Sequence, residues 1–104
     1  MLNVAVLISG GGTNLQALID AEKQGKLKSG TISLVISDRP GAYGLVRAAE
    51  NNISALTIDR RKYTNTDDFD KAILEQLRQY DIHLIVLGGF LSILGKTIVD
   101  EYKD

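Results

Sequence analysis

The sequence contains no cysteine and no tryptophan, and only one proline and one histidine. The lack of cysteine excludes disulfide bonds and thiolate metal sites, and it fits a reducing compartment. No apolar run approaches the roughly 20 residues that cross a bilayer. The first residues also lack the basic lead and cleavage site of a signal peptide. We therefore expect a cytoplasmic protein with no membrane partner.

An excess of charge of either sign is also missing, because 12 basic residues face 13 acidic ones and the net charge is −1. Such a chain has no long-range attraction for nucleic acid, so we expect no nucleic-acid partner. Histidine and carboxylate residues do not recur at the spacing of metal ligands, so we expect no metal. A length of 104 residues suits one small domain, residues 1–104.

Apolar strand patterns alternate with helical patterns along the whole chain. Continuous apolar, β-branched runs predict strands over residues 2–8, 31–37, 55–58 and 83–89. Apolar residues at helical spacing predict helices between residues 13 and 25, over 42–51, from about Thr66 onward, and briefly near 98–102. This order predicts an α/β fold, a Rossmann-like doubly wound parallel sheet of four strands in the order 3-2-1-4, with helices on both faces.

The fourth predicted strand is the most apolar of the set, which is unusual for the edge of a sheet. In the order 3-2-1-4 it would have no neighbour on one side, and exposed apolar edges promote aggregation. We therefore expect either a truncated fold or one half of an assembly, with self-association through the fourth strand in the truncated form.

The stretch SGGGTN, residues 9–14, joins the first strand to the first helix. Three glycines lack a Cβ atom and permit positive φ, so successive N–H groups can converge on an anion. The helix that follows adds free N–H groups and a positive dipole end. Thr13 and Asn14 add a hydroxyl and an amide. The pattern favours a phosphate site at residues 12–14; the alternative is a plain strand-to-helix turn.

Two common nucleotide loops do not fit this stretch. A P-loop has lysine after its last glycine, where Thr13 stands here. The dinucleotide fingerprint has a third glycine where Leu15 stands. Asp38 at the end of the second strand can still bind a ribose, so a dinucleotide-binding domain remains an alternative.

In such a sheet, ligands bind in the crevice beyond the carboxyl ends of the strands, where the strand order reverses. Two further features lie on this side of the predicted sheet. The apolar residues of GGFLSIL, 88–94, suit either a wall for a flat heteroaromatic ligand or a plug for the end of the sheet. The basic run of residues 60–62 either steers an anion or is only solvated. His83 starts the fourth strand, on the opposite edge, so we expect it to be structural. No acid–base pair falls in the crevice, and we expect no catalytic residue in this chain.

Three motifs resemble the phosphoribosylglycinamide formyltransferase family, in order and over the whole chain: VLISGGGTNLQALIDA (6–21), LVISDRPGAYGLVRA (34–48) and LIVLGGFLSIL (84–94). The resemblance implies transfer of a formyl group from 10-formyltetrahydrofolate to the amine of glycinamide ribonucleotide. It implies that the substrate phosphate is bound by Gly12, Thr13, Asn14 and Leu15. It also implies that the folate is bound by Thr66, Leu91, Ser92, Ile93 and Leu94.

The sequence departs from this family at three places. Thr66 stands where the family often has a basic residue, and Ser92 replaces a common arginine. The resemblance then implies either a lower affinity for the folate tail or compensation by Arg60, Arg61 or Lys62. The family's Asn-x-His-Pro-Ser motif and catalytic aspartate are expected beyond residue 104. The resemblance thus implies a phosphate-binding N-terminal half that is inactive alone. The alternatives are another folate-dependent formyl transferase or hydrolase, or a non-catalytic nucleotide-binding Rossmann-like module.

Overall fold

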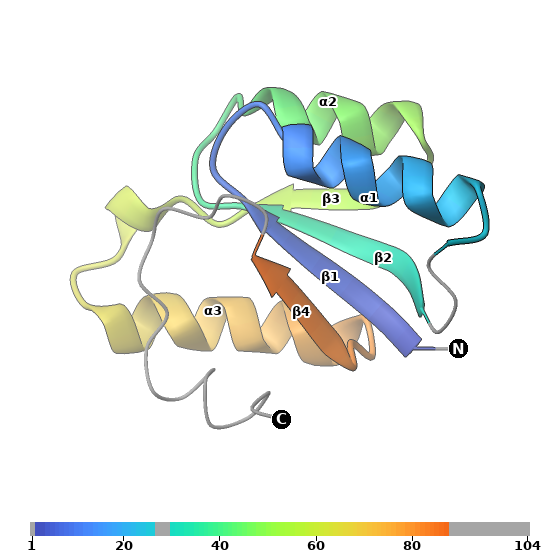
Figure 1. Ribbon diagram of the computed structural model, residues 1–104. Coiled ribbons are helices and arrows are strands. Elements are labelled where there is room, and N and C mark those ends of the chain that lie inside the picture. The colour runs from blue at the N-terminus through green and yellow to red at the C-terminus, as the bar shows by residue number, and fades with distance from the viewer. Residues whose placement is uncertain (1, 27–29, 88–104) are drawn as a thin grey trace.

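The computed structural model describes residues 2–26 and 30–87, which form a four-stranded sheet with helices on both faces (Figure 1). The elements are, in chain order, β1 (Leu2–Ile8), α1 (Thr13–Lys23), β2 (Gly30–Ser37), α2 (Tyr43–Glu50), β3 (Ser54–Thr57), the 3-10 turn η1 (Arg60–Lys62), α3 (Thr66–Gln79) and β4 (Leu84–Leu87). All strand pairs are parallel and the order is β3-β2-β1-β4. The predicted fold class and strand order are confirmed. The predicted helix near residues 98–102 lies outside the described residues.

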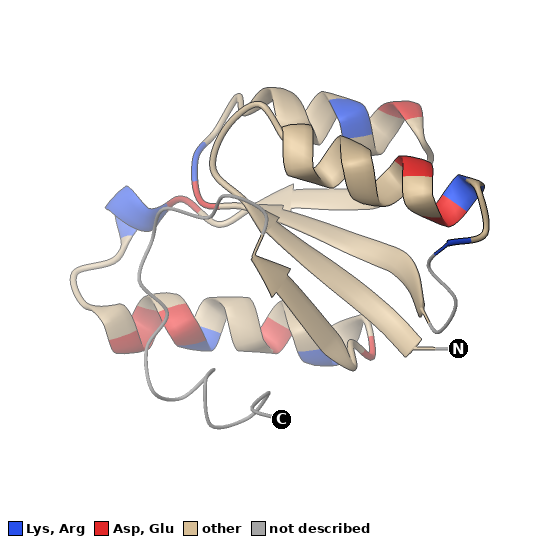
Figure 2. Cartoon of the chain, viewed as in Figure 1, with Lys and Arg blue, Asp and Glu red and all other residues tan. Residues whose placement is uncertain are grey.

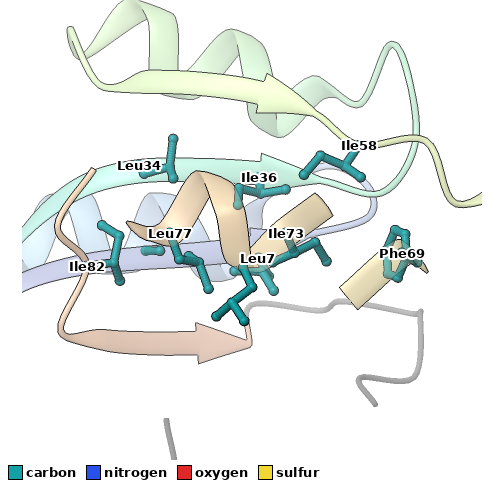
Figure 3. Packing of buried hydrophobic residues seen from close by; sticks show 10 residues of the cluster. Leu7, Leu34, Ile36, Ile58, Phe69, Ile73, Leu77 and Ile82 are labelled. Atoms are coloured by element: carbon teal, nitrogen blue, oxygen red, sulfur yellow. The ribbon is translucent and has the colours of Figure 1, made fainter. Parts of the chain in front are cut away.

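The central strand β1 is apolar on both faces because it separates two cores. Its alternate residues Val4, Val6 and Ile8 pack with α1 and α2, whereas Ala5 and Leu7 pack with α3. Figure 3 shows the α3 cluster closing against β1 and β2. The strands themselves carry no charged residue, and the charges lie on the helices and loops (Figure 2).

Helix α3 buries a wider arc than its apolar pattern predicts. Phe69, Ile73 and Leu77 are buried as expected, but Ala72 is only half-buried. Asp70 is instead fully buried, and neither of its carboxylate oxygens has a hydrogen-bond partner among the described residues. The helix lies along the sheet, so positions on both sides of the Ile73 row become covered.

Side-chain caps fix the two segments between β3 and α3. Helix α3 begins at Thr66 as predicted, and the Asn65 Oδ1 atom accepts the Asp68 N–H at 2.9 Å. The polar residues 59–65 predict an irregular loop. Part of this stretch is instead η1, because the Asp59 carboxylate accepts the Arg61 N–H and closes a short helical turn.

The amino ends of β1 and β4 are joined through His83. Its Nδ1 atom accepts the Asn3 N–H at 2.9 Å, and its own backbone N–H donates to the Asn3 oxygen at 2.9 Å. The predicted position of His83, away from the carboxyl ends of the strands, is confirmed. Within the described part of the chain, β4 pairs only with β1.

The loop after β1 packs backbone to backbone against α2. Gly12 has φ 76° and ψ 31°, and a Cβ atom on it would lie only 2.7 Å from the Gly44 Cα atom. A Cβ atom on Gly44 would collide with the Ile8 side chain. The Gly44 N–H donates to the Gly10 oxygen at 3.1 Å. Both glycines are therefore required by packing, and they set the distance between the loop and α2.

Replacing Gly12 by alanine tests this contact, with Gly25 as the matched control. Gly25 has φ 77°, and a Cβ atom on it would have nothing within 4 Å, so Gly25→Ala reports backbone strain alone. We expect Gly25→Ala to lower the free energy of unfolding by about 1 kcal/mol. Gly12→Ala adds the collision with α2 and should cost about 3 kcal/mol in urea denaturation. Equal losses in the two variants would contradict the contact.

Candidate functional site

Asp38 ties together three loops at the carboxyl edge of the sheet. Its Oδ1 atom accepts the Ser9 hydroxyl at 2.6 Å, and its N–H donates to the Ile8 oxygen at 3.2 Å. Its own backbone oxygen accepts the Arg60 N–H at 3.1 Å. The Asp38 side chain is buried, so its carboxylate faces the protein interior. That orientation does not suit the ribose contact which the dinucleotide alternative needs.

The amino end of α1 is an uncapped helix terminus. Gly12 occupies the N-cap position with no side-chain cap, and the first turn contains no acidic residue. Thr13 and Asn14 are exposed, whereas the Leu15 side chain is fully buried in the core shared with α2. Of the predicted phosphate residues, Leu15 can therefore offer only its backbone N–H. The free N–H groups and the positive end of the helix dipole suit an anion.

Open space adjoins the loop on its other two glycines. A Cβ atom on Gly10 or Gly11 would have nothing within 4 Å. A hollow of about 270 Å³ lies between this loop and the segment after β2, lined by Ser9, Gly10, Gly11, Arg39, Pro40, Gly41, Ala42 and Tyr43. Packing does not demand glycine at positions 10 and 11, so the room beside them is available to a ligand.

Arg47 contacts the same loop, although the α2 prediction rested on apolar positions only. The Arg47 Nε atom donates to the Gly11 oxygen at 2.7 Å, and its Nη1 atom donates to Gln16 Oε1 at 3.2 Å. The guanidinium lies 5.0 Å from the Tyr43 ring centroid. The sequence signal for this residue is its spacing of four from Tyr43, which places both side chains on one face of a helix.

The basic turn η1 has two of its three cations already engaged. Arg61 pairs with Asp59 through its Nη2 atom at 2.9 Å and its Nε atom at 3.0 Å, and these bonds lower the pKa of the Asp59 carboxyl below its usual value. The Arg60 guanidinium lies 5.3 Å from the Phe69 ring centroid and donates to the Tyr63 oxygen. The Lys62 side chain has no hydrogen bond or ion pair with another described residue. Lys62 is therefore the cation of η1 that can meet an anion.

The predicted folate residues are only partly described. Thr66 is half-buried at the start of α3, on the opposite face of the sheet from α1 (Figure 1). Its exposed neighbours Asp67 and Asp68 disfavour an anionic ligand at that helix end. Leu91, Ser92, Ile93 and Leu94 lie outside the described residues. The structure thus places residues 12–15 together and Thr66 apart from them, across the sheet.

The described part of the chain shows neither a metal site nor a helix that could span a membrane. Between residues 2–26 and 30–87, no three histidine or carboxylate side chains gather closely enough to hold a metal ion. No helix in these same ranges has the length and apolar character needed to cross a membrane.

Comparison with known proteins places the chain in a family. Residues 2–104 match the family model described as formyl transferase. Phosphoribosylglycinamide formyltransferase of Escherichia coli is 38% identical over 97% of this chain and 47% of its own length. The Haemophilus influenzae protein of the same name is 44% identical over 98% of this chain and 48% of its own length.

Solved structures agree with this result. Glycinamide ribonucleotide transformylase 1 from Symbiobacterium toebii superposes with a TM-score of 0.92 at 38% identity, covering 99% of this chain and 48% of that one. The resemblance predicted from the three sequence motifs is confirmed. The chain spans about half the length of the curated bacterial relatives it matches. The chain therefore belongs to the formyl transferase family.

Proposed function

We propose that this chain is the phosphate-binding part, residues 1–104, of a cytoplasmic phosphoribosylglycinamide formyltransferase of purine biosynthesis. The whole protein would transfer the formyl group of 10-formyltetrahydrofolate to the amine of glycinamide ribonucleotide. The observation that carries the proposal is the uncapped amino end of α1, preceded by a glycine in the left-handed conformation. Similarity to phosphoribosylglycinamide formyltransferases supports glycinamide ribonucleotide as the molecule whose phosphate would bind there.

Within this chain the proposed roles are binding roles. The N–H groups of Gly12, Thr13, Asn14 and Leu15 would surround the phosphate, and the Thr13 hydroxyl and Asn14 amide are exposed beside them. Thr66 and residues 91–94 would form part of the folate pocket. The groups that polarise the formyl carbon and move the proton would come from outside residues 1–104. Residues 1–104 alone would therefore bind glycinamide ribonucleotide but would not catalyse formyl transfer.

Binding of glycinamide ribonucleotide tests this function directly. We expect calorimetry to detect binding, and to detect none for NAD or for the riboside without its phosphate. Thr13→Val should weaken binding about tenfold, because a hydroxyl bond to a charged phosphate is lost. Thr64→Val removes an exposed hydroxyl outside the site and should change nothing. Equal affinity for the ribonucleotide and the riboside, or formyl transfer by residues 1–104, would contradict the proposal.

Lys62 is proposed to compensate for the uncharged Thr66. Its ammonium group is exposed on η1, three residues before the helix cap Asn65, whereas Arg60 and Arg61 are engaged elsewhere. The glutamate tail of the folate is the anion that would need it.

We expect Lys62→Met to weaken binding of a polyglutamylated 10-formyltetrahydrofolate about fivefold at low salt. Screening should remove most of this effect at 0.5 M salt, since the group is exposed. Lys71→Met is the control, because it removes the same charge from an exposed position farther along α3. An equally large effect in the Lys71 variant would show general charge attraction and would contradict the proposed role of Lys62.

The open edge of β4 is proposed to mediate self-association of residues 1–104. Leu84 and Leu87 are 40% and 57% exposed, and no described strand pairs with the free side of β4. An apolar edge with unpaired backbone groups is a template for a second strand.

Sedimentation velocity tests this edge. We expect residues 1–104 to dimerise at about 100 μM, a concentration typical of a weak interface. Leu87→Lys should restore the monomer, because a lysine on an edge strand opposes pairing. Leu2→Lys, at a comparably exposed leucine of β1, should leave the dimer intact. A monomer at all concentrations would refute the proposal.

A further inference from the structure

Helix α2 holds two successive carbonyl groups of the glycine loop. The Gly44 N–H donates to the Gly10 oxygen at 3.1 Å, and the Arg47 Nε atom donates to the Gly11 oxygen at 2.7 Å. The first donor belongs to the backbone, which any residue at position 44 would supply if it fitted. The second donor is a side chain, so it depends on arginine at position 47.

These two bonds fix the direction of two N–H groups. In a trans peptide the C=O and the following N–H point in opposite directions. When the carbonyls of Gly10 and Gly11 face α2, the N–H groups of Gly11 and Gly12 must face away from α2. Within the described part of the chain, neither N–H group has a hydrogen-bond acceptor. They point to the same side of the loop, next to the open first turn of α1.

Arg47 is itself held in one position. Its Nη1 atom bonds to Gln16 on α1, its guanidinium stacks near Tyr43, and its Cδ atom lies 3.4 Å from the point where a Gly12 Cβ atom would be. Both of its acceptors are neutral, so its charge is not cancelled by a carboxylate among the described residues. The bond to Gly11 is therefore made by a side chain with little freedom left.

We propose that Arg47 is a positioning residue of the phosphate site, which holds the glycine loop so that the N–H groups of Gly11 and Gly12 face the phosphate. This inference rests on the proposed function and deepens it, because it adds Gly11 to the binding set and places the phosphate on the side of the loop away from α2. A loop of three glycines loses much conformational freedom when it becomes ordered. Arg47 orders it before the ligand arrives, which lowers the cost of binding.

Two substitutions separate positioning from charge. Glutamine places its amide nitrogen at the Nε position of arginine, so Arg47→Gln keeps a donor for the Gly11 oxygen and loses the charge. Lysine places a methylene group at that position, so Arg47→Lys keeps the charge and loses the donor. Lys23→Gln is the control, because it removes one positive charge from an exposed position in the last turn of α1, at the end of that helix away from the glycine loop.

Affinity for glycinamide ribonucleotide and for inorganic phosphate should be measured in 0.3 M salt, where attraction between exposed charges is screened. We expect Arg47→Lys to bind about tenfold more weakly than the parent chain, and Arg47→Gln to lose less than about threefold. Lys23→Gln should bind as the parent does. Equal affinities of the Gln and Lys variants, or tighter binding by the Lys variant, would overturn the proposal.

Backbone order gives a readout that needs no ligand. Amide relaxation should show Gly11 and Gly12 rigid in the parent and in Arg47→Gln, and order parameters below about 0.6 in Arg47→Lys. Rigid glycine amides in Arg47→Lys would overturn the positioning role. If the parent chain fails to bind glycinamide ribonucleotide, the proposed function fails, and the relaxation data still decide whether Arg47 orders the loop.

Discussion

The close approach of Gly12 to Gly44 is the contact on which the rest of the site depends. A Cβ atom on either residue would strike the neighbouring backbone or the Ile8 side chain. Because neither glycine has a Cβ atom, α2 comes near enough for the Gly44 N–H and the Arg47 side chain to reach the loop. The same approach leaves Gly12 in the left-handed conformation from which α1 starts. Helix direction and loop orientation thus follow from one backbone contact.

The architecture could be predicted from the sequence because its causes are local and periodic. Residues of β1 are apolar on both faces, which predicts a strand covered by helices on each side. Alternation of strand and helix patterns predicts parallel pairing with crossovers, and the order β3-β2-β1-β4 agrees. The start of α3 at Thr66 was also predictable, since Asp67 and Asp68 favour a helix amino end.

The contacts that shape the site could not be predicted in this way, because they join residues far apart in the chain. Ser9 and Asp38 are separated by 29 positions, and Arg47 and Gly11 by 36. Nothing in the residue types says that Asp38 faces inward or that Arg47 bonds to a carbonyl group. Burial of Asp70 is the clearest failure of pattern, since a carboxylate is expected on the exposed side of a helix. The predicted assignment of Leu15 to the phosphate site did not distinguish its buried side chain from its backbone.

The two proposed ends of the substrate site use different electrostatics, and this difference follows from where the charges lie. At the glycine loop the attraction would come from N–H dipoles, which the hydrogen bonds from Gly44 and Arg47 hold in one direction. Fixed dipoles at short range are only weakly screened by salt, and they favour an anion of the right size over any other charge. At η1 the attraction would come from the exposed Lys62, whose charge also acts on Asp59. Salt screens such an exposed charge, and it discriminates little between ligands of different shape. A substrate phosphate would therefore be recognised by geometry, whereas a folate tail would only be attracted by charge. In a chain with a net charge of −1, selectivity for the substrate has to come from the geometry of the glycine loop.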